Sequence, residues 1–355
     1  MNSQRLQKMF LPLLFVGAAA FFLVWEHEGS LDRCTTIKDS PEKQNNGEAN
    51  WHHHNGHAFG TYYNIRYSSS RDLEWEISDC LERFDHSMST FNTSSTVSRL
   101  NTNESDSTDE WFDEMFATAS EVSILSGGAF DITVAPLVNA WGFGFRNKEK
   151  VTPKLIDSLL RYVDYEGLQV EGGRLIKRHK ETLVDASAIA KGQACDVVAR
   201  TLSDAGCENI LVDIGGEVVC RGVNEQGSAW RIGITRPDDD PSGTNRALQA
   251  VVSSNNLCMA TSGNYRQFYY DGGVRRSHTI DPRTGYPAES NLLSSTVTAR
   301  SCMLADALAT ACMVLGSDSA LALIDRVPGA ECYLITSCGG DSLCVVTSAG
   351  FPLDK

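Results

Sequence analysis

Residues 192–221 have the sequence GQACDVVARTLSDAGCENILVDIGGEVVCR, and this stretch indicates the fold class. Its first part, Gly192–Ala205, has apolar side chains at helical spacing and is followed by a glycine, which favours a helix end. The next part holds two apolar runs, Asn209–Ile214 and Glu217–Arg221, joined through Gly215-Gly216, which predicts a β-hairpin. A helix followed by a hairpin, without strict alternation of helix and strand, predicts an α+β fold rather than a doubly wound one.

The rest of the chain continues this mixture of elements. We expect further strands at residues 59–67, 182–186, 230–235, 249–253, 294–299 and 331–336, and further helices at residues 72–84, 109–125, 305–315 and after Thr152-Pro153. The strands follow from alternating or continuous apolar runs, and the helices from apolar spacing of three and four residues. Together they predict an α+β fold with mixed sheets and packed helices.

The N-terminus differs from the rest. An uncharged apolar run, Met9–Trp25, follows Arg5 and Lys8 and precedes Glu26. This charge order predicts a cytoplasmic N-terminus and an exported remainder. We interpret residues 1–28 as an uncleaved signal anchor; a cleaved signal peptide and a buried core helix are the alternatives. Residues 29–56 are polar and are predicted to be a linker, and residues 57–355 to be the folded domain.

Composition excludes some classes of function. The chain has 355 residues, of which 42% are hydrophobic, so it can build a substantial core. Its 31 basic and 45 acidic residues give a net charge of -14, which argues against nucleic acid as a partner.

The 11 cysteines include no Cys-x-x-Cys pair. Cys332, Cys338 and Cys344 recur without a nearby histidine, which argues against a zinc site, and an exported chain allows disulfides. Cys195 and Cys312 lie in apolar helical patterns, as does Cys302, and are expected in the core. The histidine-rich stretch at residues 51–57 admits a metal-binding tract, but a solvated linker is the better interpretation.

Asp306 and Thr310 are four residues apart on a predicted helix, so both side chains project from one face. A carboxylate and a hydroxyl are hard oxygen donors that suit Mg²⁺ or Ca²⁺. The alternative is that Asp306 caps the helix and Thr310 bonds back to a carbonyl.

The stretch Val184–Gly192 carries Asp185 and Lys191 where a predicted strand gives way to a helix. Backbone amides at a helix start, together with a lysine, form an anion site. The alternative makes Asp185 a helix cap and Lys191 an exposed lysine.

Residues 277–287 are dense in polar and turn residues. His278 has the chemistry of a general base near neutral pH, although the segment also fits a tight turn. Ser262, His278 and Asp281 could in principle form the triad of a Ser-His-Asp hydrolase. The sequence around Ser262 is not that of a nucleophile elbow, which argues against this alternative. Upstream, Phe130 and Asp131 suit the face and edge of a planar ring, although core packing explains much of that segment.

Taken in order, these motifs resemble the ApbE family of FAD:protein FMN transferases over roughly residues 57–338. The matching pieces are Gly60-Thr61, Met88–Phe91 with Ser98–Asn101, Gly128–Asp131 with Trp141–Gly144, Asp185–Gly192, Asp213–Gly216, Ala260–Gly263, Ser277-His278 with Asp281–Pro287, and Ala305–Thr310. The resemblance implies an ApbE-like, T-fold-related domain outside the cytoplasmic membrane, anchored in the inner membrane by its N-terminal segment.

The resemblance also implies a chemistry. A Mg²⁺-dependent enzyme splits FAD, transfers FMN through a phosphoester bond to a Thr or Ser hydroxyl of a target protein, and releases AMP. The target would be a subunit of a membrane redox complex. Two alternatives are a Mg²⁺-dependent FAD pyrophosphatase and a non-catalytic flavin-binding protein.

Site residues carry over position by position. Asp306, Thr310 and the Ala188 carbonyl would bind the metal, while His278 and Asp306 would be catalytic. The residues implied to line FAD are Ala129, Phe130, Asp131, Asp185, Lys191 and Ile280, with Phe59 and Phe91 as further wall residues. The chain departs from the family in lacking a lipobox, in Ala186 where many members have Leu, and in Asn264 where Asp is frequent.

Overall fold

The computed structural model describes residues 50–144, 150–237, 247–264, 268–271, 274–339 and 342–354. The predicted anchor at residues 1–28 and residues 29–49 of the predicted linker lie outside this part of the chain. All described residues belong to one compact unit. Within them, no helix combines the length and the apolar character needed to cross a bilayer.

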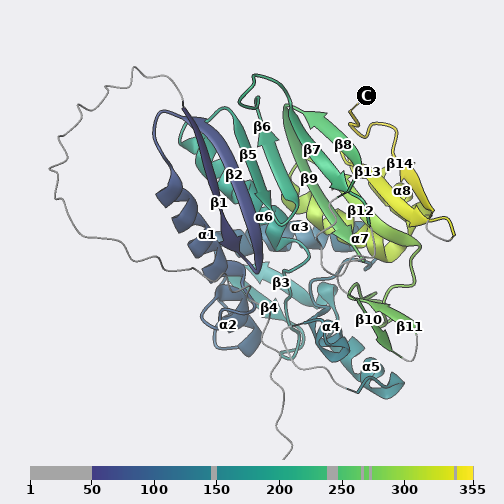
Figure 1. The fold of residues 1–355 in the computed structure, drawn as a ribbon. Helices are drawn as coiled ribbons and strands as arrows, with labels where there is room; N and C mark the ends of the chain where they lie inside the picture. The colour runs from purple at the N-terminus through teal and green to yellow at the C-terminus, as the bar shows by residue number, and fades with distance from the viewer. Residues whose placement is uncertain are drawn as a thin grey trace, which may run out of the picture. The chain divides into compact units, whose positions relative to one another are not determined.

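An eight-stranded sheet with the order β1-β2-β5-β6-β9-β12-β13-β14 forms the centre of this unit (Figure 1). Its strands are β1 (Asn50–Ala58), β2 (Thr61–Ser69), β5 (Ile210–Ile214), β6 (Glu217–Arg221), β9 (Asn256–Gly263), β12 (Leu292–Thr298), β13 (Glu331–Ser337) and β14 (Leu343–Thr347). The α+β expectation is confirmed. We expected mixed sheets, but the pairings between described strands are antiparallel. Strands that are adjacent in the sheet are joined either by hairpins or by longer segments. In both cases the next strand begins at the end of the sheet where the previous strand finished, which makes the pair antiparallel.

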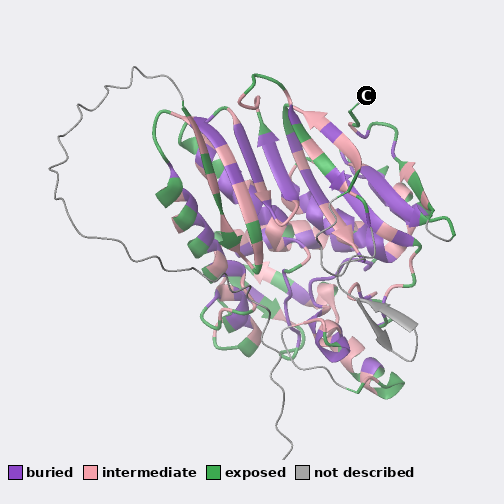
Figure 2. Cartoon of the chain, viewed as in Figure 1, coloured by how far each residue is buried: buried purple, intermediate pink, exposed green. Residues whose placement is uncertain are grey.

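Helices cover one face of this sheet. The described helices are α1 (Glu74–Met88), α2 (Thr96–Thr102), α3 (Glu110–Ser126), α4 (Ala135–Trp141), α5 (Pro153–Leu159), α6 (Ala190–Asp204), α7 (Cys302–Leu315) and α8 (Ser317–Ile324), with short 3-10 turns at Leu160–Tyr162 and Tyr165–Gly167. Of these, α6, α7 and α8 pack directly on the sheet, and α1 and α3 pack on α6 and α7. Helix α7 packs on β9 and β12 and contacts α3, α6 and α8. It is therefore buried almost throughout, and its small alanines allow this close packing. Figure 2 shows buried residues concentrated on the central strands.

A hairpin of β7 (Trp230–Thr235) and β8 (Leu248–Ser254) covers part of the other face. Trp230, Ile234 and Val252 of the hairpin form a second apolar core with Val218 and Met259 of the sheet. Three smaller groups complete the unit: the pair β3 (Leu168–Glu171) and β4 (Arg174–Lys177), the pair β10 (Phe268–Asp271) and β11 (Val274–Ser277), and a third apolar cluster that includes α4 and α5.

Local signals placed several elements correctly. The hairpin through Gly215-Gly216 is confirmed as β5–β6, and Gly127 ends α3 in the left-handed conformation. Thr152 caps α5 by accepting a hydrogen bond from the Leu155 N–H. Helix α7 starts three residues earlier than expected, because Ser301 is its N-cap.

Two expectations are wrong. Residues 182–186 have no regular secondary structure, since the Asp185 N–H bonds to the Ile132 carbonyl and the Val184 backbone bonds to the Asn101 side chain. Residues 50–56 are not linker but strand β1, paired along its length with β2. Here His52 and His54 stack on Tyr67, so polar residues occupy a half-buried edge strand. No group of three metal-ligating side chains of His, Cys, Asp or Glu occurs in the described part of the chain, this tract included.

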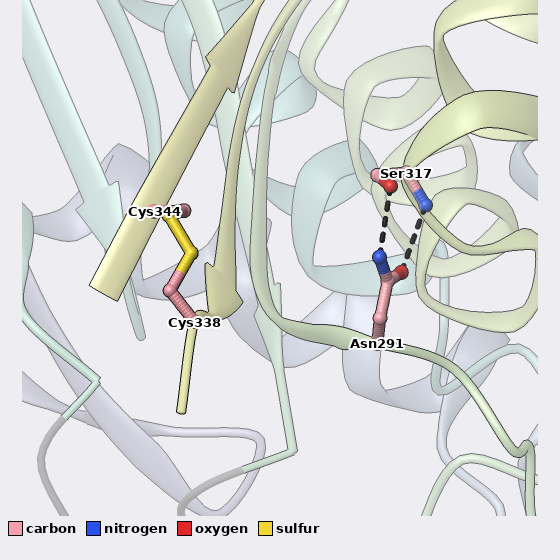
Figure 3. Close-up of a disulfide and its surroundings, with 4 residues drawn as sticks. All are labelled: Asn291, Ser317, Cys338 and Cys344. Atoms are coloured by element: carbon pink, nitrogen blue, oxygen red, sulfur yellow. Dashed lines mark hydrogen bonds between the residues drawn. A yellow bond between two sulfur atoms is a disulfide. The ribbon is translucent and has the colours of Figure 1, made fainter. Parts of the chain in front are cut away.

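Cysteines divide into two kinds. Cys338 and Cys344 form a disulfide across the turn between β13 and β14 (Figure 3). Nearby, Asn291 bonds to the Ser317 hydroxyl and accepts from its N–H, which ties the start of β12 to α8. Cys195, Cys302 and Cys312 are fully buried, as expected of core residues.

Candidate active site

The twelve site residues implied by the sequence line the same cavity, which has a volume of about 1020 Å³. They are Phe59, Phe91, Ala129, Phe130, Asp131, Asp185, Ala188, Lys191, His278, Ile280, Asp306 and Thr310. Between them they come from six separate stretches of sequence, so the fold brings together residues that are more than 200 positions apart. The geometry therefore supports one site rather than several independent motifs.

Asp306 lies in the second turn of α7 and is only 2% exposed. Its Oδ2 accepts a hydrogen bond of 3.0 Å from the Gly192 N–H at the start of α6. Since Ser301 caps α7, the interpretation of Asp306 as the N-cap is wrong. One turn further on, the Thr310 hydroxyl lies 3.2 Å from the Ser262 hydroxyl of β9. Both oxygens thus reach the cavity from a helix that has little freedom to move.

Gly192 makes this arrangement possible. A Cβ at this position would clash with the Cys302 carbonyl oxygen and would lie 2.8 Å from Asp306 Cβ. The start of α6 can therefore approach α7 closely only because residue 192 has no side chain.

Lys191 projects between two carboxylates. Its Nζ lies 3.1 Å from Glu217 Oε1 and 3.8 Å from Asp306 Oδ2, so it is a paired cation and not merely an exposed lysine. Burial alone lowers the pKa of Lys191, but Asp306 and Glu217 outweigh burial and raise it. The lysine is therefore a fixed positive charge inside the cavity.

Glu217 was not anticipated from the sequence. It is 3% exposed, lines the cavity at the start of β6, and its Oε2 has no hydrogen-bond partner among the described residues. Burial raises its pKa, whereas the nearby Lys191 ammonium lowers it and favours the charged carboxylate. The one feature of the sequence that could have pointed to Glu217 is its position, since it is a charged residue between Gly215-Gly216 and an apolar strand.

Two neighbouring segments each contribute a carboxylate to the cavity, Asp131 and Asp185. Asp131 follows Phe130 and accepts hydrogen bonds from the Thr133 N–H at 2.7 Å and hydroxyl at 2.6 Å. It is 7% exposed, and burial raises its pKa to about 6. Asp185 accepts from the Ser187 N–H in a turn before α6, so it does not cap that helix.

Aromatic residues stand at the mouth of the cavity. Phe59 packs edge-on against Phe84, with ring centroids 5.5 Å apart. Phe91 is 80% exposed in the loop after α1, so a planar ligand can cover it without displacing the core. Ile280 is buried and pairs with Pro287 in an isolated bridge.

His278 lines the cavity, with its ring 6.4 Å from that of Phe143. The Asp281 carboxylate is bound by the Arg283 side chain at 2.8 and 2.9 Å, within a local turn. Because the Ser262 hydroxyl is bonded to Thr310, these contacts give the Ser-His-Asp hydrolase no support.

Three oxygen donors at the cavity allow a test of whether the site suits a metal ion. Asp306 supplies a carboxylate, Thr310 a hydroxyl and Ala188 a backbone carbonyl at the same cavity. All three are oxygen donors, which suit a hard cation such as Mg²⁺ and not a soft metal. The residues present therefore fit this ion.

Comparisons with known proteins agree with this site. The model of the ApbE family matches residues 59–334. A FAD:protein FMN transferase of Vibrio cholerae is 39% identical over 284 residues, which cover 77% of this chain and 84% of that protein. One from Haemophilus influenzae is 35% identical over 288 residues, covering 76% and 82%.

Solved structures extend the likeness to the fold. The flavin transferase ApbE from Vibrio cholerae superposes with a TM-score of 0.76 at 36% identity, covering 85% of this chain and 98% of that one. The ApbE protein of Thermotoga maritima gives 0.73 at 27% identity, covering 84% and 97%. The family match, the sequence relatives and the shared fold together show that this chain belongs to the ApbE family.

Proposed function

We propose that this protein transfers the FMN half of FAD to a Thr or Ser hydroxyl of a target protein, forming a phosphoester and releasing AMP. The observation that carries the proposal is the placement of Asp306, Thr310 and Lys191 in one cavity with an aromatic, partly apolar wall. Relatives that carry the name FAD:protein FMN transferase span most of this chain, which supports the same activity here.

The reaction places clear demands on the chain. The acceptor oxygen attacks the phosphorus on the FMN side of the diphosphate, the bond from that phosphorus to the AMP oxygen breaks, and the hydroxyl loses its proton. We assign this proton to His278 and the neutralisation of negative charge on the diphosphate to Lys191, since both residues line the cavity. Asp306, Thr310 and the Ala188 carbonyl would hold Mg²⁺, which supplies further charge neutralisation in phosphoryl transfer when bound.

FAD orientation falls to other residues of the same cavity. Phe130, Phe59 and Phe91 offer ring contacts, and Asp131 and Asp185 offer carboxylates. We assign the flavin half to these residues, because rings and a few polar groups suit a planar heterocycle, and the diphosphate to the α6–α7 side, where Lys191 lies beside Asp306.

The test is incubation of the full chain with FAD, Mg²⁺ and candidate target proteins. Expected results are flavin fluorescence that stays on the target in a denaturing gel, a mass increase equal to FMN phosphoester formation, and one AMP per label. FMN and AMP appearing without any labelled protein would favour the FAD pyrophosphatase. FAD recovered intact after long incubation would favour a non-catalytic flavin-binding protein.

For cellular location, we propose that residues 1–28 anchor the chain in the inner membrane and that the catalytic domain faces the extracytoplasmic side. The charge order around Met9–Trp25 supports this orientation. The acceptor would then be a subunit of a membrane redox complex that exposes its Thr or Ser on the same side. Protease treatment of spheroplasts should degrade the catalytic domain, and alkaline washing should leave the chain in the membrane; a protease-protected or released domain would contradict the proposal.

A further inference from the structure

The β7–β8 hairpin has one covered edge and one open edge. At the β8 edge, the Asp354 N–H donates a 2.8 Å hydrogen bond to the Val251 carbonyl, and Val252 forms a bridge with Leu353. The C-terminal residues therefore cover β8. Strand β7 pairs only with β8 among the described strands, so its other edge has no neighbouring strand.

The register shows which backbone groups occupy that open edge. Val251 lies opposite Gly233, and its carbonyl points to Asp354, away from β7. In an antiparallel pair, residues directly opposite each other point their N–H and C=O groups both toward or both away from the partner strand. The N–H and C=O of Gly233 therefore point away from β8, as do those of Arg231 two residues earlier. None of the described residues provides a backbone partner for them.

This open edge faces the active-site cavity. Trp230, Arg231, Ile232 and Gly233 all line it, although successive side chains of a strand point to opposite faces. Only the edge of the strand is common to four consecutive residues. The cavity that contains Asp306 thus extends along β7.

The facing wall is the exposed surface of the main sheet. Asn64 and Arg66 of β2 and Asp213 of β5 line the cavity there. The Arg66 guanidinium lies 3.5 Å from Glu225 Oε1 in the loop that precedes β7. This wall is polar and carries both positive and negative charge. It therefore suits a ligand with short polar side chains better than one with a large apolar surface.

We propose that the open edge of β7 binds the acceptor polypeptide as an added β-strand, which brings its Thr or Ser hydroxyl into the cavity with Asp306 and Thr310. The proposal rests on the proposed transferase function. Outward donors and acceptors on β7 recur every second residue, about every 7 Å, which matches the repeat of an extended polypeptide. A dinucleotide has no such repeat of paired donors and acceptors, so the edge fits the protein substrate and not FAD.

Recognition by an edge has a specific consequence. Backbone hydrogen bonds would supply affinity for any extended segment, and alternate side chains would contact the polar wall formed by Asn64, Arg66 and Asp213. The acceptor segment would therefore need to be extended and free of proline at the positions whose N–H groups face β7.

The first experiment alters the enzyme. Gly233→Pro removes an N–H that points into the cavity and removes no donor of the β7–β8 hydrogen bonds. A Cβ at residue 233 lies 2.6 Å from Leu248 Cδ2, so the exposed Leu248 side chain has to rotate. The matched control is Val345→Pro on β14, another edge strand: Val345 lies opposite Ile335, and the flanking bond from Cys338 N–H to the Ser342 carbonyl places the Val345 N–H on the outer edge. Val345 does not line the cavity.

We expect Gly233→Pro to lower kcat/KM for the acceptor protein roughly fivefold to tenfold, the effect of one lost hydrogen bond. Its affinity for FAD should stay unchanged, and Val345→Pro should label the acceptor like the wild type. Equal labelling by Gly233→Pro and the wild type would overturn the proposal. An equal loss of labelling in both proline variants, or a loss of FAD affinity in Gly233→Pro, would also overturn it.

The second experiment leaves the enzyme intact, so it holds even where Gly233→Pro fails to fold. Peptides around the residue that mass spectrometry identifies as labelled are synthesised with one N-methyl group moved along the backbone. Labelling should fall at every second position and stay within about twofold elsewhere. A flat profile would overturn edge binding, whereas absence of label on the unmodified acceptor protein would instead reject the transferase function. If β7 pairs with a second copy of this chain, size-exclusion chromatography will show a wild-type dimer that Gly233→Pro dissociates, and this result would also overturn the proposal.

Discussion

At the scale of single residues, Asp306 combines a structural contact with the metal-binding role proposed for it. Its Oδ2 accepts from the Gly192 N–H, which joins α6 to α7, and the same carboxylate faces the cavity. Asn at this position keeps an oxygen acceptor but removes the charge that a cation requires. The two roles can therefore be separated by one substitution.

We expect Asp306→Asn to fold with a near-normal melting temperature and to lose transfer activity by on the order of 100-fold or more, because a bound metal ion supplies several kcal/mol of transition-state stabilisation. The measurement is the rate of flavin labelling at several Mg²⁺ concentrations. Asp325→Asn, an exposed carboxylate outside the cavity, is the control. Full activity of Asp306→Asn at low Mg²⁺ would contradict the assignment of Asp306 as a metal ligand.

Lys191 and Glu217 form a buried pair next to Asp306. Removal of one member of such a pair leaves an uncompensated charge and costs about 3–5 kcal/mol. We expect Lys191→Met to lower the free energy of unfolding by about 3 kcal/mol. Adding Glu217→Gln should restore part of this loss, because one of the two buried carboxylates is then neutral. Urea unfolding of both single variants and the double variant measures the coupling; strictly additive effects would show that the two residues do not interact.

At the scale of elements, the contact between α6 and α7 depends on Gly192. We expect Gly192→Ala to destabilise the fold by about 1–3 kcal/mol, the usual cost of forcing an extra methyl group into a packed interior. The neighbouring backbone of Cys302 cannot rotate away, so the helices must separate. Thermal unfolding tests this expectation. An unchanged melting temperature would show that the two helix ends are farther apart than described.

The disulfide between β13 and β14 belongs to a different part of the fold. Cys338 and Cys344 are six residues apart, and closing so short a loop stabilises by about 2 kcal/mol in the chain-entropy model. We expect Cys338→Ser/Cys344→Ser to lower the melting temperature but to leave flavin transfer unchanged, since neither cysteine lines the cavity. Paired calorimetry and labelling assays measure both effects, and a loss of activity at a temperature where the variant is folded would contradict this separation.

Helices and strands could be predicted from the sequence where a few consecutive residues determine them. The hairpin at Gly215-Gly216 and the Thr152 cap each depend on a few consecutive residues. The error at residues 182–186 has a different origin, because an apolar run becomes a strand only when another strand is adjacent, and here the partners are a loop and the Asn101 side chain. Strand β1 was missed because its histidines look solvated until Tyr67 stacks against them.

Local spacing alone does not identify the site residues. Asp306 and Thr310 share one helical face, and this spacing is visible in the sequence, but it also fitted a helix cap. The other members of the set came from the ordered motifs of the family, and the structure shows that all of them line one cavity. Glu217 was missed because its importance comes from Lys191, which is 26 positions away and meets it only after α6 packs on β6. The open edge of β7 is also invisible in the sequence, since it depends on which strands lack a neighbour.

At the scale of the whole molecule, buried carboxyl groups determine how stability changes with pH. Burial raises the pKa of Asp131 to about 6, above its ordinary value of 3.8. A raised pKa in the folded state means that the protonated form is favoured by folding, so this contribution is complete below about pH 4 and is lost as the pH rises through 6. Asp196 follows the same direction, because burial also raises its pKa to about 6.

We therefore expect the protein without ligands to unfold at a higher temperature at pH 5 than at pH 7.5. Asp131→Asn should reduce this difference, since an amide keeps the acceptor for both Thr133 bonds and does not titrate. The contribution of Asp131 is at most about 3 kcal/mol, at 1.36 kcal/mol for each pKa unit. Melting curves of both proteins across this pH range provide the measurement, and identical pH profiles would contradict the raised pKa.

Helix α7 is enclosed by the sheet and by α3, α6 and α8, and it carries Asp306 and Thr310. On the proposed assignment of Asp306 and Thr310 as Mg²⁺ ligands, a shortage of magnesium would slow this protein without unfolding it, since packing alone keeps the helix that carries them in shape. The supply of the ion would then set the rate of flavin transfer, and restoring the supply would restore the activity of the existing protein without new synthesis.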